Sequence, residues 1–182
     1  MKLIKITHFS LFILILSGLA FCQPLFASES VASPDGNIVF TVSGNERNWL
    51  VYSITFNNEP VVSESRLGLR FREQKSFESD LDVKQANRQS FDETWEQPWG
   101  ERRLVRNHYN ELRIQLQDST ERHLNLRIRV FDDGVGFRYE VPAQDGLGTV
   151  EIVNELTEFH LPEKSTAWWI PGRAYNRYED LY

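Results

Sequence analysis

Three consecutive segments of the chain alternate apolar and polar residues with a period of two. The apolar positions are Leu112, Ile114 and Leu116, then Leu124, Leu126, Ile128 and Val130, then Val135, Phe137, Tyr139 and Val141. Successive side chains of a strand point to opposite faces, so this pattern predicts strands that bury one face and leave the other in water. The sequence Phe131-Asp132-Asp133-Gly134 indicates a tight hairpin turn, because Gly and Asp accept a positive φ. We therefore expect antiparallel sheets.

Shorter strands are predicted on both sides of this region. They cover residues 38–42, 50–56, 67–71, 150–153 and 156–159, with 167–170 as one more. Turns are expected at Ser33-Pro34-Asp35-Gly36 and at Asn57-Asn58. Residues 72–100 carry no clear period and are expected to form mostly loop. No segment combines a helical period with capping residues, so no helix is predicted. Many short strands joined by short turns predict an all-β, antiparallel β-sandwich.

The N-terminal segment has the pattern of an export signal. Lys2 and Lys5 precede the apolar run 9–22, and the small residue Ala27 follows it. This order is typical of a secretory signal peptide, and the run is shorter than the roughly 20 apolar residues of a membrane-spanning helix. We therefore expect residues 1–27 to be removed. The mature protein would be periplasmic or extracellular, with no membrane contact after cleavage.

Cys22 is the only cysteine of the chain. In a lipoprotein it would carry the lipid, but Phe21 stands where that signal needs a small residue, so lipoprotein anchoring is the minority alternative. Cleavage after Ala27 leaves a single domain, residues 28–182, without cysteine, which excludes a disulfide and a zinc–thiolate site there. A domain of this size has one core and is too short for a (β/α)₈ barrel of about 250 residues.

The charge balance argues against nucleic acid as a partner. The net charge of −6 becomes −8 when Lys2 and Lys5 are removed with the signal, whereas nucleic-acid-binding domains present a basic face. Aromatic residues, in contrast, make up 13% of the chain. This aromatic content is high and includes 5 Trp and 12 Phe.

Tryptophans supply the candidate binding residues. Trp95 and Trp99 stand near carboxylates, and Trp168 directly precedes Trp169. Aromatic rings match the apolar face of a pyranose, so Trp95, Trp99 and Trp168 are candidate substrate-binding residues. The alternative is that they close one end of the sandwich core. In a strand, Trp168 and Trp169 would point to opposite faces, one into the core and the other toward a partner.

The other polar residues form no recognised catalytic pattern. The histidines lack H-E-x-x-H spacing, and G-x-S-x-G is absent. Asp132 and Asp133 are interpreted as turn residues. Glu155 and Glu158 are interpreted as solvent-facing residues or salt-bridge partners. No catalytic residue is therefore assigned.

Several short motifs follow one another along the chain. They are Ser33-Pro34-Asp35-Gly36, Trp95-x-x-x-Trp99-Gly100-Glu101, the run from Arg106 to Leu112, the run from Phe131 to Tyr139, the run from Glu155 to Phe159, Thr166-Ala167-Trp168-Trp169-Ile170-Pro171 and Asn176-Arg177-Tyr178-Glu179. In this order they resemble the N-terminal domain of glycoside hydrolase family 97. The resemblance covers nearly all of residues 31–182.

This resemblance implies an antiparallel β-super-sandwich, galactose-mutarotase-like, from an exported bacterial enzyme that cleaves α-glucosides or α-galactosides. Family members join this domain to a catalytic (β/α)₈ barrel and a small C-terminal β domain. The catalytic acid and base or nucleophile lie in the barrel, and no residue here matches them. Activity in the family depends on calcium, and the N-terminal domain contributes to that site. Glu179 in Asn-Arg-Tyr-Glu matches this metal-binding role.

The resemblance leads to one expected function and two alternatives. We expect a non-catalytic domain, inactive alone, that packs on a (β/α)₈ barrel in cis or in trans and completes its active site for an α-linked oligosaccharide. The end at Tyr182, without a barrel, suggests a truncated or split gene. Calcium binding by this chain alone is expected to be weak or absent. The alternatives are a free-standing carbohydrate-binding module and a secreted structural or partner-binding sandwich.

Overall fold

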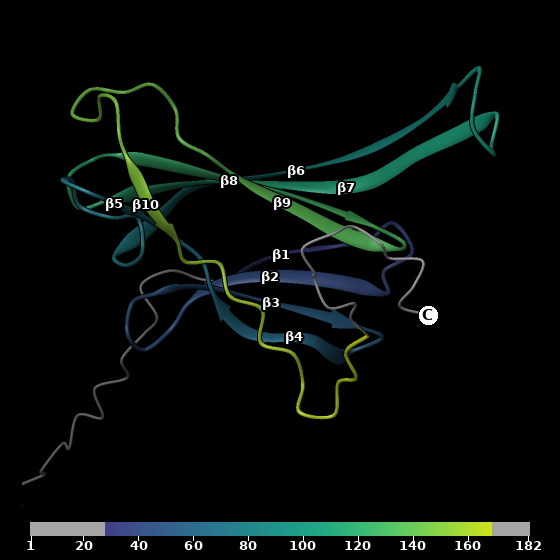
Figure 1. The fold of residues 1–182 in the computed structure, drawn as a ribbon, viewed down its shortest axis with the longest axis horizontal. Coiled ribbons are helices and arrows are strands. Elements are labelled where there is room, and N and C mark those ends of the chain that lie inside the picture. Colours follow the sequence, from purple (N-terminus) through teal and green to yellow (C-terminus); the bar gives the residue numbers. More distant parts are fainter. Residues whose placement is uncertain (1–27, 169–182) are drawn as a thin grey trace, which may run out of the picture.

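The computed structural model describes residues 28–168, and every regular element within them is a β-strand. Two four-stranded antiparallel sheets pack face to face (Figure 1). The first sheet consists, in order, of β1 (Glu29–Ala32), β2 (Ile38–Gly44), β3 (Leu50–Phe56) and β4 (Glu59–Arg66). The second consists of β6 (Leu81–Glu96), β7 (Leu104–Asp118), β8 (His123–Phe131) and β9 (Gly134–Glu140). The predicted all-β antiparallel sandwich is therefore confirmed.

A small two-stranded sheet closes one end of the sandwich. It pairs β5 (Leu69–Phe71) with β10 (Ile152–Glu155), as Figure 1 shows. After β10 the chain runs beside β4, where the Ser63 amide donates to the His160 carbonyl at 2.8 Å. No helix within residues 28–168 is long and apolar enough to cross a membrane.

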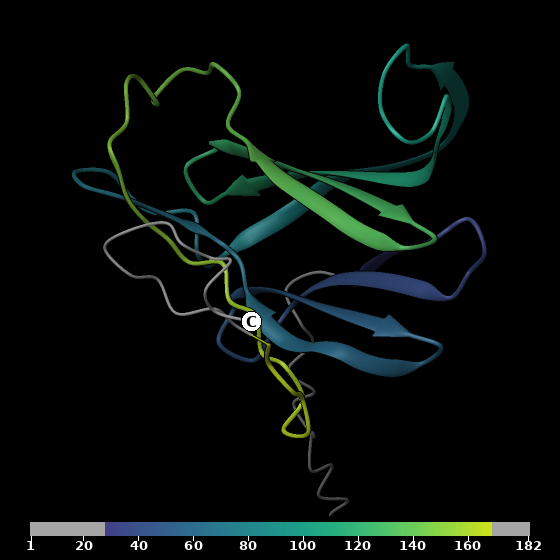
Figure 2. The same ribbon diagram turned by 45° about the vertical axis from the view of Figure 1, so that its right-hand side comes forward.

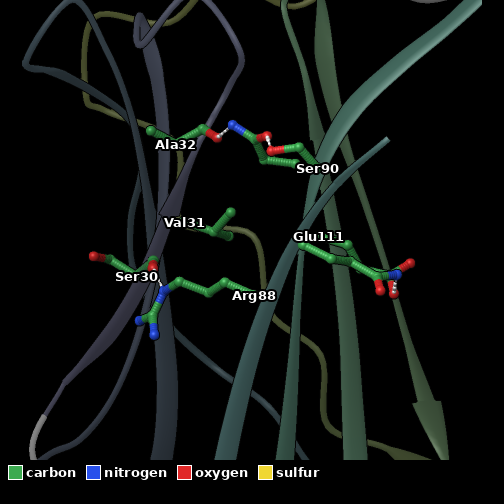
Figure 3. Close-up of a pocket in the computed structure, with 8 residues that line it drawn as sticks. Ser30, Val31, Ala32, Arg88, Ser90 and Glu111 are labelled. Atoms are coloured by element: carbon green, nitrogen blue, oxygen red, sulfur yellow. Dashed lines mark hydrogen bonds between the residues drawn. The ribbon is translucent and has the colours of Figure 1, made fainter. Parts of the chain in front are cut away.

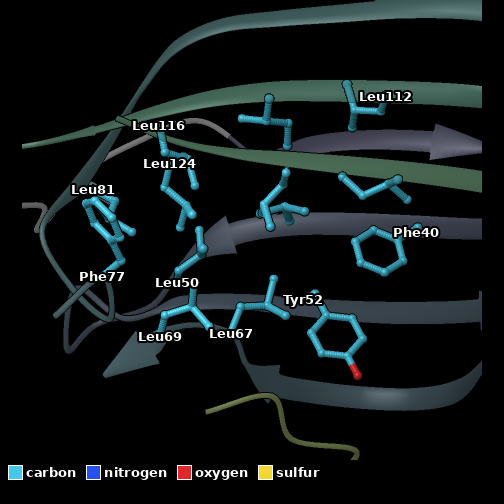
Figure 4. Packing of buried hydrophobic residues seen from close by; sticks show 14 of the residues in the cluster. Phe40, Leu50, Tyr52, Leu67, Leu69, Phe77, Leu81, Leu112, Leu116 and Leu124 are labelled. Atoms are coloured by element: carbon cyan, nitrogen blue, oxygen red, sulfur yellow. The ribbon is translucent and has the colours of Figure 1, made fainter. Parts of the chain in front are cut away.

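The core lies between the two sheets and is built from the alternating positions of the sequence (Figure 4). The inward side chains of β7 and β8 include Leu112 and Leu124, and both are fully buried. They face β2 and β3, where the rings of Phe40 and Tyr52 stack with their centroids 5.1 Å apart. The ring of Phe137 on β9 lies 5.6 Å from Phe40 and 5.4 Å from Tyr52, so it joins the two sheets.

Two predicted hairpin turns form, for different backbone reasons. Asn57 and Asn58, between β3 and β4, both have positive φ (51° and 66°), as a two-residue primed turn requires. Between β8 and β9, neither Asp132 nor Asp133 has a positive φ, and neither does Gly134. The turn was therefore predicted correctly, but the reason given for it was wrong.

The sequence-based strand predictions fail mainly in the segment expected to be loop. Residues 81–96 of that segment form β6, the longest strand described. Residues 156–159, predicted as a strand, form no strand. The predicted strand at 167–170 has no strand in its first two residues, and its last two lie outside the described residues.

A two-stranded arm extends from the second sheet. The last register pair between β7 and β8 is Asn110↔Val130, whereas the pairing of β6 with β7 continues to Glu96↔Leu104. Residues 91–109, here called the arm, therefore extend past the edge of the sandwich. Figures 1 and 2 show this ribbon projecting away from both sheets.

Candidate functional site

The tip of the arm is a loop that holds Trp99 in solvent. The Gln97 amide donates to the Arg103 carbonyl at 2.9 Å, and the Gln97 side chain donates to the Arg102 carbonyl at 2.7 Å. Gly100 takes a φ of 104°, a conformation that favours glycine. These features close the loop on its own backbone and leave Trp99 79% exposed.

Trp95 lies near the end of β6, just before this loop. It pairs with Val105 across the arm and is 45% exposed. Its position on β6 has the same parity as Phe91, so both side chains belong to one face of the ribbon. Neither Trp95 nor Trp99 closes the core, which removes the structural alternative for these two residues. Their contact with a sugar stays a prediction.

Trp168 is 93% exposed and is the last described residue. The segment before it runs beside β4, through the Ser63–His160 bridge, while Trp95 and Trp99 lie at the far end of the arm (Figure 1). Within residues 28–168, no ring contact joins Trp168 to either of them. Glu179 and Trp169 lie outside the described residues.

An aromatic row, missed by the sequence analysis, crosses the base of the arm. The rings of Phe91 on β6 and Tyr109 on β7 stack at 5.2 Å, and Phe131 at the end of β8 lies 5.2 Å from Tyr109. The guanidinium of Arg129 sits 4.5 Å from the centre of the Tyr109 ring. The three rings come from three strands, so only the strand register could have revealed the row.

Next to this row lies a buried carboxylate. The Glu111 side chain is 0% exposed and contacts three arginines. Arg113 and Arg129 donate hydrogen bonds to it, the latter at 2.7 Å, and Arg127 Nε is 3.5 Å away. Burial alone raises the pKa of Glu111, but these hydrogen bonds and charges outweigh it and lower the pKa below its ordinary value. Glu111 is therefore held as a carboxylate.

A pocket of about 370 Å³ lies where β1 meets the base of the arm (Figure 3). Its polar groups bond mainly to one another. Arg88 Nε donates to the Ser30 carbonyl and the side-chain Nδ2 of Asn110 donates to the Ala32 carbonyl, both at 2.9 Å. Ser90 donates to Asn110 at 2.6 Å. In Figure 3 the Glu111 carboxylate points away from these groups. These hydrogen bonds join β6 and β7, just below the arm, to β1 of the first sheet.

The described residues were predicted to contribute no calcium ligand, and Glu179 lies outside them. Calcium takes 6–8 oxygen ligands, yet no group of three His, Cys, Asp or Glu within residues 28–168 is placed to hold a metal ion. The calcium prediction therefore rests on Glu179 alone.

The other carboxylates considered in the sequence have structural roles. Asp132 Oδ1 accepts a hydrogen bond from the Asp35 amide at 2.9 Å, which joins a turn of one sheet to a turn of the other. Glu158 accepts from the Arg66 amide at 3.1 Å, and Glu155 accepts from the Thr157 hydroxyl at 2.7 Å.

The fold and this surface define an antiparallel β-sandwich domain that carries an aromatic-tipped arm. Comparison with known sequences gives the particular family. The chain belongs to the glycosyl-hydrolase 97 N-terminal family, whose sequence model matches residues 31–182. The predicted resemblance is thereby confirmed.

Individual relatives agree with this assignment. The chain is 26% identical over 138 residues to the retaining alpha-galactosidase of Bacteroides thetaiotaomicron, covering 76% of this chain and 20% of that protein. It is similar to a glycoside hydrolase family 97 enzyme from Pseudoalteromonas sp. strain K8 in complex with acarbose, with 41% identity and a TM-score of 0.75, covering 82% of this chain and 23% of that one. A second solved structure, of a beta-arabinopyranosidase, shares 27% identity with a TM-score of 0.68, covering 74% and 21%. The chain thus spans about a fifth of the length of these relatives.

Proposed function

We propose that this chain is the non-catalytic N-terminal domain of an exported α-glycosidase, and that it packs on a (β/α)₈ barrel and completes its active site. The observation that carries the proposal is the family match over residues 31–182, in relatives about five times as long as the matched region. Those relatives include an alpha-galactosidase and an enzyme in complex with acarbose. They support an α-linked oligosaccharide as the substrate of the whole enzyme.

The arm supports a role in contacting the barrel or its substrate. Its tip exposes Trp95, Trp99 and Leu104, which are large apolar side chains outside the core. Trp is enriched where protein surfaces meet, because it buries a large area and can still donate a hydrogen bond. The pairing of β6 with β7 continues to Glu96 and Leu104, directly beside these side chains. In the proposal, the arm is the element that reaches the catalytic domain.

A chimera tests this function. Residues 28–182 replace the matching N-terminal part of the Pseudoalteromonas enzyme, and hydrolysis of an α-glucoside is measured. We expect no turnover from the chain alone, low turnover from the enzyme without its N-terminal part, and restored turnover in the chimera. Trp99→Ala and Trp95→Ala in the chimera should each reduce kcat/KM by about tenfold, the size expected for an interface anchor.

The matched control is Phe56→Ala, since Phe56 is exposed to the same fraction, 45%, as Trp95 but lies on β3. It should leave kcat/KM unchanged. Hydrolysis by the chain alone at the rate of the whole enzyme would contradict the proposal. So would an unimpaired enzyme that lacks the N-terminal part.

A free-standing carbohydrate-binding module is the second candidate, and the high exposure of Trp99 and Trp168 favours it. Calorimetry of the chain with maltotriose separates the two functions. Heat of binding that is lost on Trp99→Ala supports the module. Absence of heat, with rescue in the chimera, supports the domain of a larger enzyme.

Export and calcium complete the proposal. Export is supported by the cationic and apolar pattern of residues 1–27. A calcium contribution is supported by the match of Glu179 to the family motif, with the other oxygen ligands supplied by the barrel.

A further inference from the structure

The second sheet has an outer face, the one turned away from the β1–β4 sheet, and a cluster of arginines lies on it. The register places Glu111, Arg129 and Gly136 next to one another across β7, β8 and β9. Two residues further along the strands, the next row of side chains on this face consists of Arg113, Arg127 and Arg138. These positions alternate with core residues of the same strands, so they all belong to the outer face.

A groove runs between these side chains. Its volume is about 310 Å³, and it is lined by Arg127, Arg129, Phe131, Gly136, Phe137 and Arg138. A Cβ placed at Gly136 would meet no atom within 4 Å. The glycine therefore leaves open space where any other residue would project a side chain. Such a volume lies at the small end of ligand pockets, which span about 300–1,000 Å³, and suits a single ring.

The charges around the groove do not balance. Four guanidinium groups, of Arg113, Arg127, Arg129 and Arg138, are accompanied by the carboxylates of Glu111 and Glu140. The excess is two positive charges, in a chain whose net charge is −6. Like charges this close repel one another, so an anion bound here would be stabilised.

Two of these arginines keep donors for a ligand. Arg129 reaches Glu111 through Nε, and its terminal nitrogens donate to no other residue of the described chain. Arg138 holds Glu140 through Nε and Nη2 and retains Nη1. Their side chains are 40% and 61% exposed. A guanidinium presents its donors in a planar fork that matches a carboxylate.

The opposite wall of the groove is aromatic. Phe131 is half-buried there and packs against Tyr109, which in turn stacks on Phe91. A ring wall of this kind contacts the apolar face of a pyranose. The groove therefore combines an apolar wall, a flat open floor at Gly136 and cationic donors on the remaining side.

We propose that this groove binds a carboxylated sugar, with its ring over Gly136 and against Phe131 and its carboxylate facing Arg129 and Arg138. A neutral sugar would leave the two excess charges unbalanced. A carboxylate without a ring would leave the aromatic wall without a contact. A uronate residue of a glycan supplies both groups on one ring, and the assignment stands independently of the proposed α-glycosidase.

Calorimetry or NMR titration of the purified chain tests the site with four probes: trigalacturonate, maltotriose, sodium sulfate and a triglutamate peptide. We expect trigalacturonate to bind at least about tenfold more tightly than each of the others, which is the effect of about one additional charge-assisted pair. Its affinity should fall as salt is added, because the guanidinium groups are partly exposed.

Two variants separate the groove from its surroundings. Gly136→Val fills the floor without changing any charge, and its φ is not in the left-handed region, so the strand accepts valine. Arg138→Gln removes one exposed donor. Each should weaken trigalacturonate binding by about tenfold or more. Arg72→Gln, which removes an equally exposed arginine paired with Glu151, should leave it unchanged.

Four results would overturn the assignment. Equal binding of maltotriose would show a neutral sugar surface, and equal binding of sulfate would show an adventitious ion only. Equal binding of triglutamate would show a surface for acidic peptides. Undiminished affinity in a folded Gly136→Val chain would place the ligand elsewhere.

Discussion

At the scale of single residues, the structure uses two buried carboxylates to hold arginines. Glu111 anchors the arginine cluster on the outer face, while Asp118 fastens Arg122 at the turn between β7 and β8. The Asp118 side chain is 0% exposed and accepts from Arg122 Nη2 at 2.7 Å and Nε at 3.0 Å. Arg122 in turn donates to the Lys75 carbonyl at 2.7 Å. This pair therefore fixes the loop that precedes β6.

The Asp118 pair makes stability depend on acid pH. Burial raises its pKa, but hydrogen bonds from Arg122 and Thr120 outweigh this, so the pKa falls from 3.8 to about 2. Since the folded pKa is the lower one, the stabilisation is complete above about pH 4 and is lost as the pH falls toward 2. It amounts to about 2 kcal/mol. Urea unfolding across this range should show a smaller pH dependence for Asp118→Asn than for the native chain. An equal pH dependence of the free energy of unfolding in the two chains would contradict this role.

At the scale of elements, the sequence predicts strands well where one face is buried. β7, β8 and β9 follow the alternation of Leu112, Ile128 and Phe137 with polar residues. β6 was not predicted, because most of the second half of this strand belongs to the arm, where no other sheet covers it. Most side chains on both faces of β6 are therefore exposed, and no apolar alternation appears in its sequence. Its backbone hydrogen bonds go to β7, and backbone pairing without a buried face leaves no hydrophobic period in the sequence. The arm was missed for the same reason.

Shortening the arm should therefore cost little stability. Replacing residues 93–107 by Asn-Gly, a two-residue turn that suits hairpins, removes Trp95 and Trp99 but no core residue. We expect the free energy of unfolding to change by less than about 1 kcal/mol, as for surface changes away from packed features. Thermal and urea unfolding of the chain measure this. The same deletion in the chimera should abolish rescue of hydrolysis. A large loss of stability would instead make the arm part of the folded core.

At the scale of the whole molecule, the apolar–polar alternation predicted the class of fold, and the order of the short motifs predicted the family. Period-two segments without helical signals define a sandwich, but they occur in many unrelated proteins. The candidate site was predicted only where single residues carried the signal, as with Trp95, Trp99 and Trp168, all of which are exposed. The aromatic row and the arginine groove arise from strands that meet in space. Their members become neighbours only once the register is known.

The two sheets should unfold as one unit, because Phe137 contacts rings of the opposite sheet. Phe137→Ala removes the only ring of β9 that contacts both Phe40 and Tyr52 within the described residues, and we expect a loss of about 3 kcal/mol. Phe56→Ala, at an exposed position, should cost less than about 1 kcal/mol. Urea unfolding followed by tryptophan fluorescence and by circular dichroism measures both variants. The two probes should give one coincident transition in the native chain. Separate transitions, or equal losses for the two variants, would mean that the sheets are held together elsewhere.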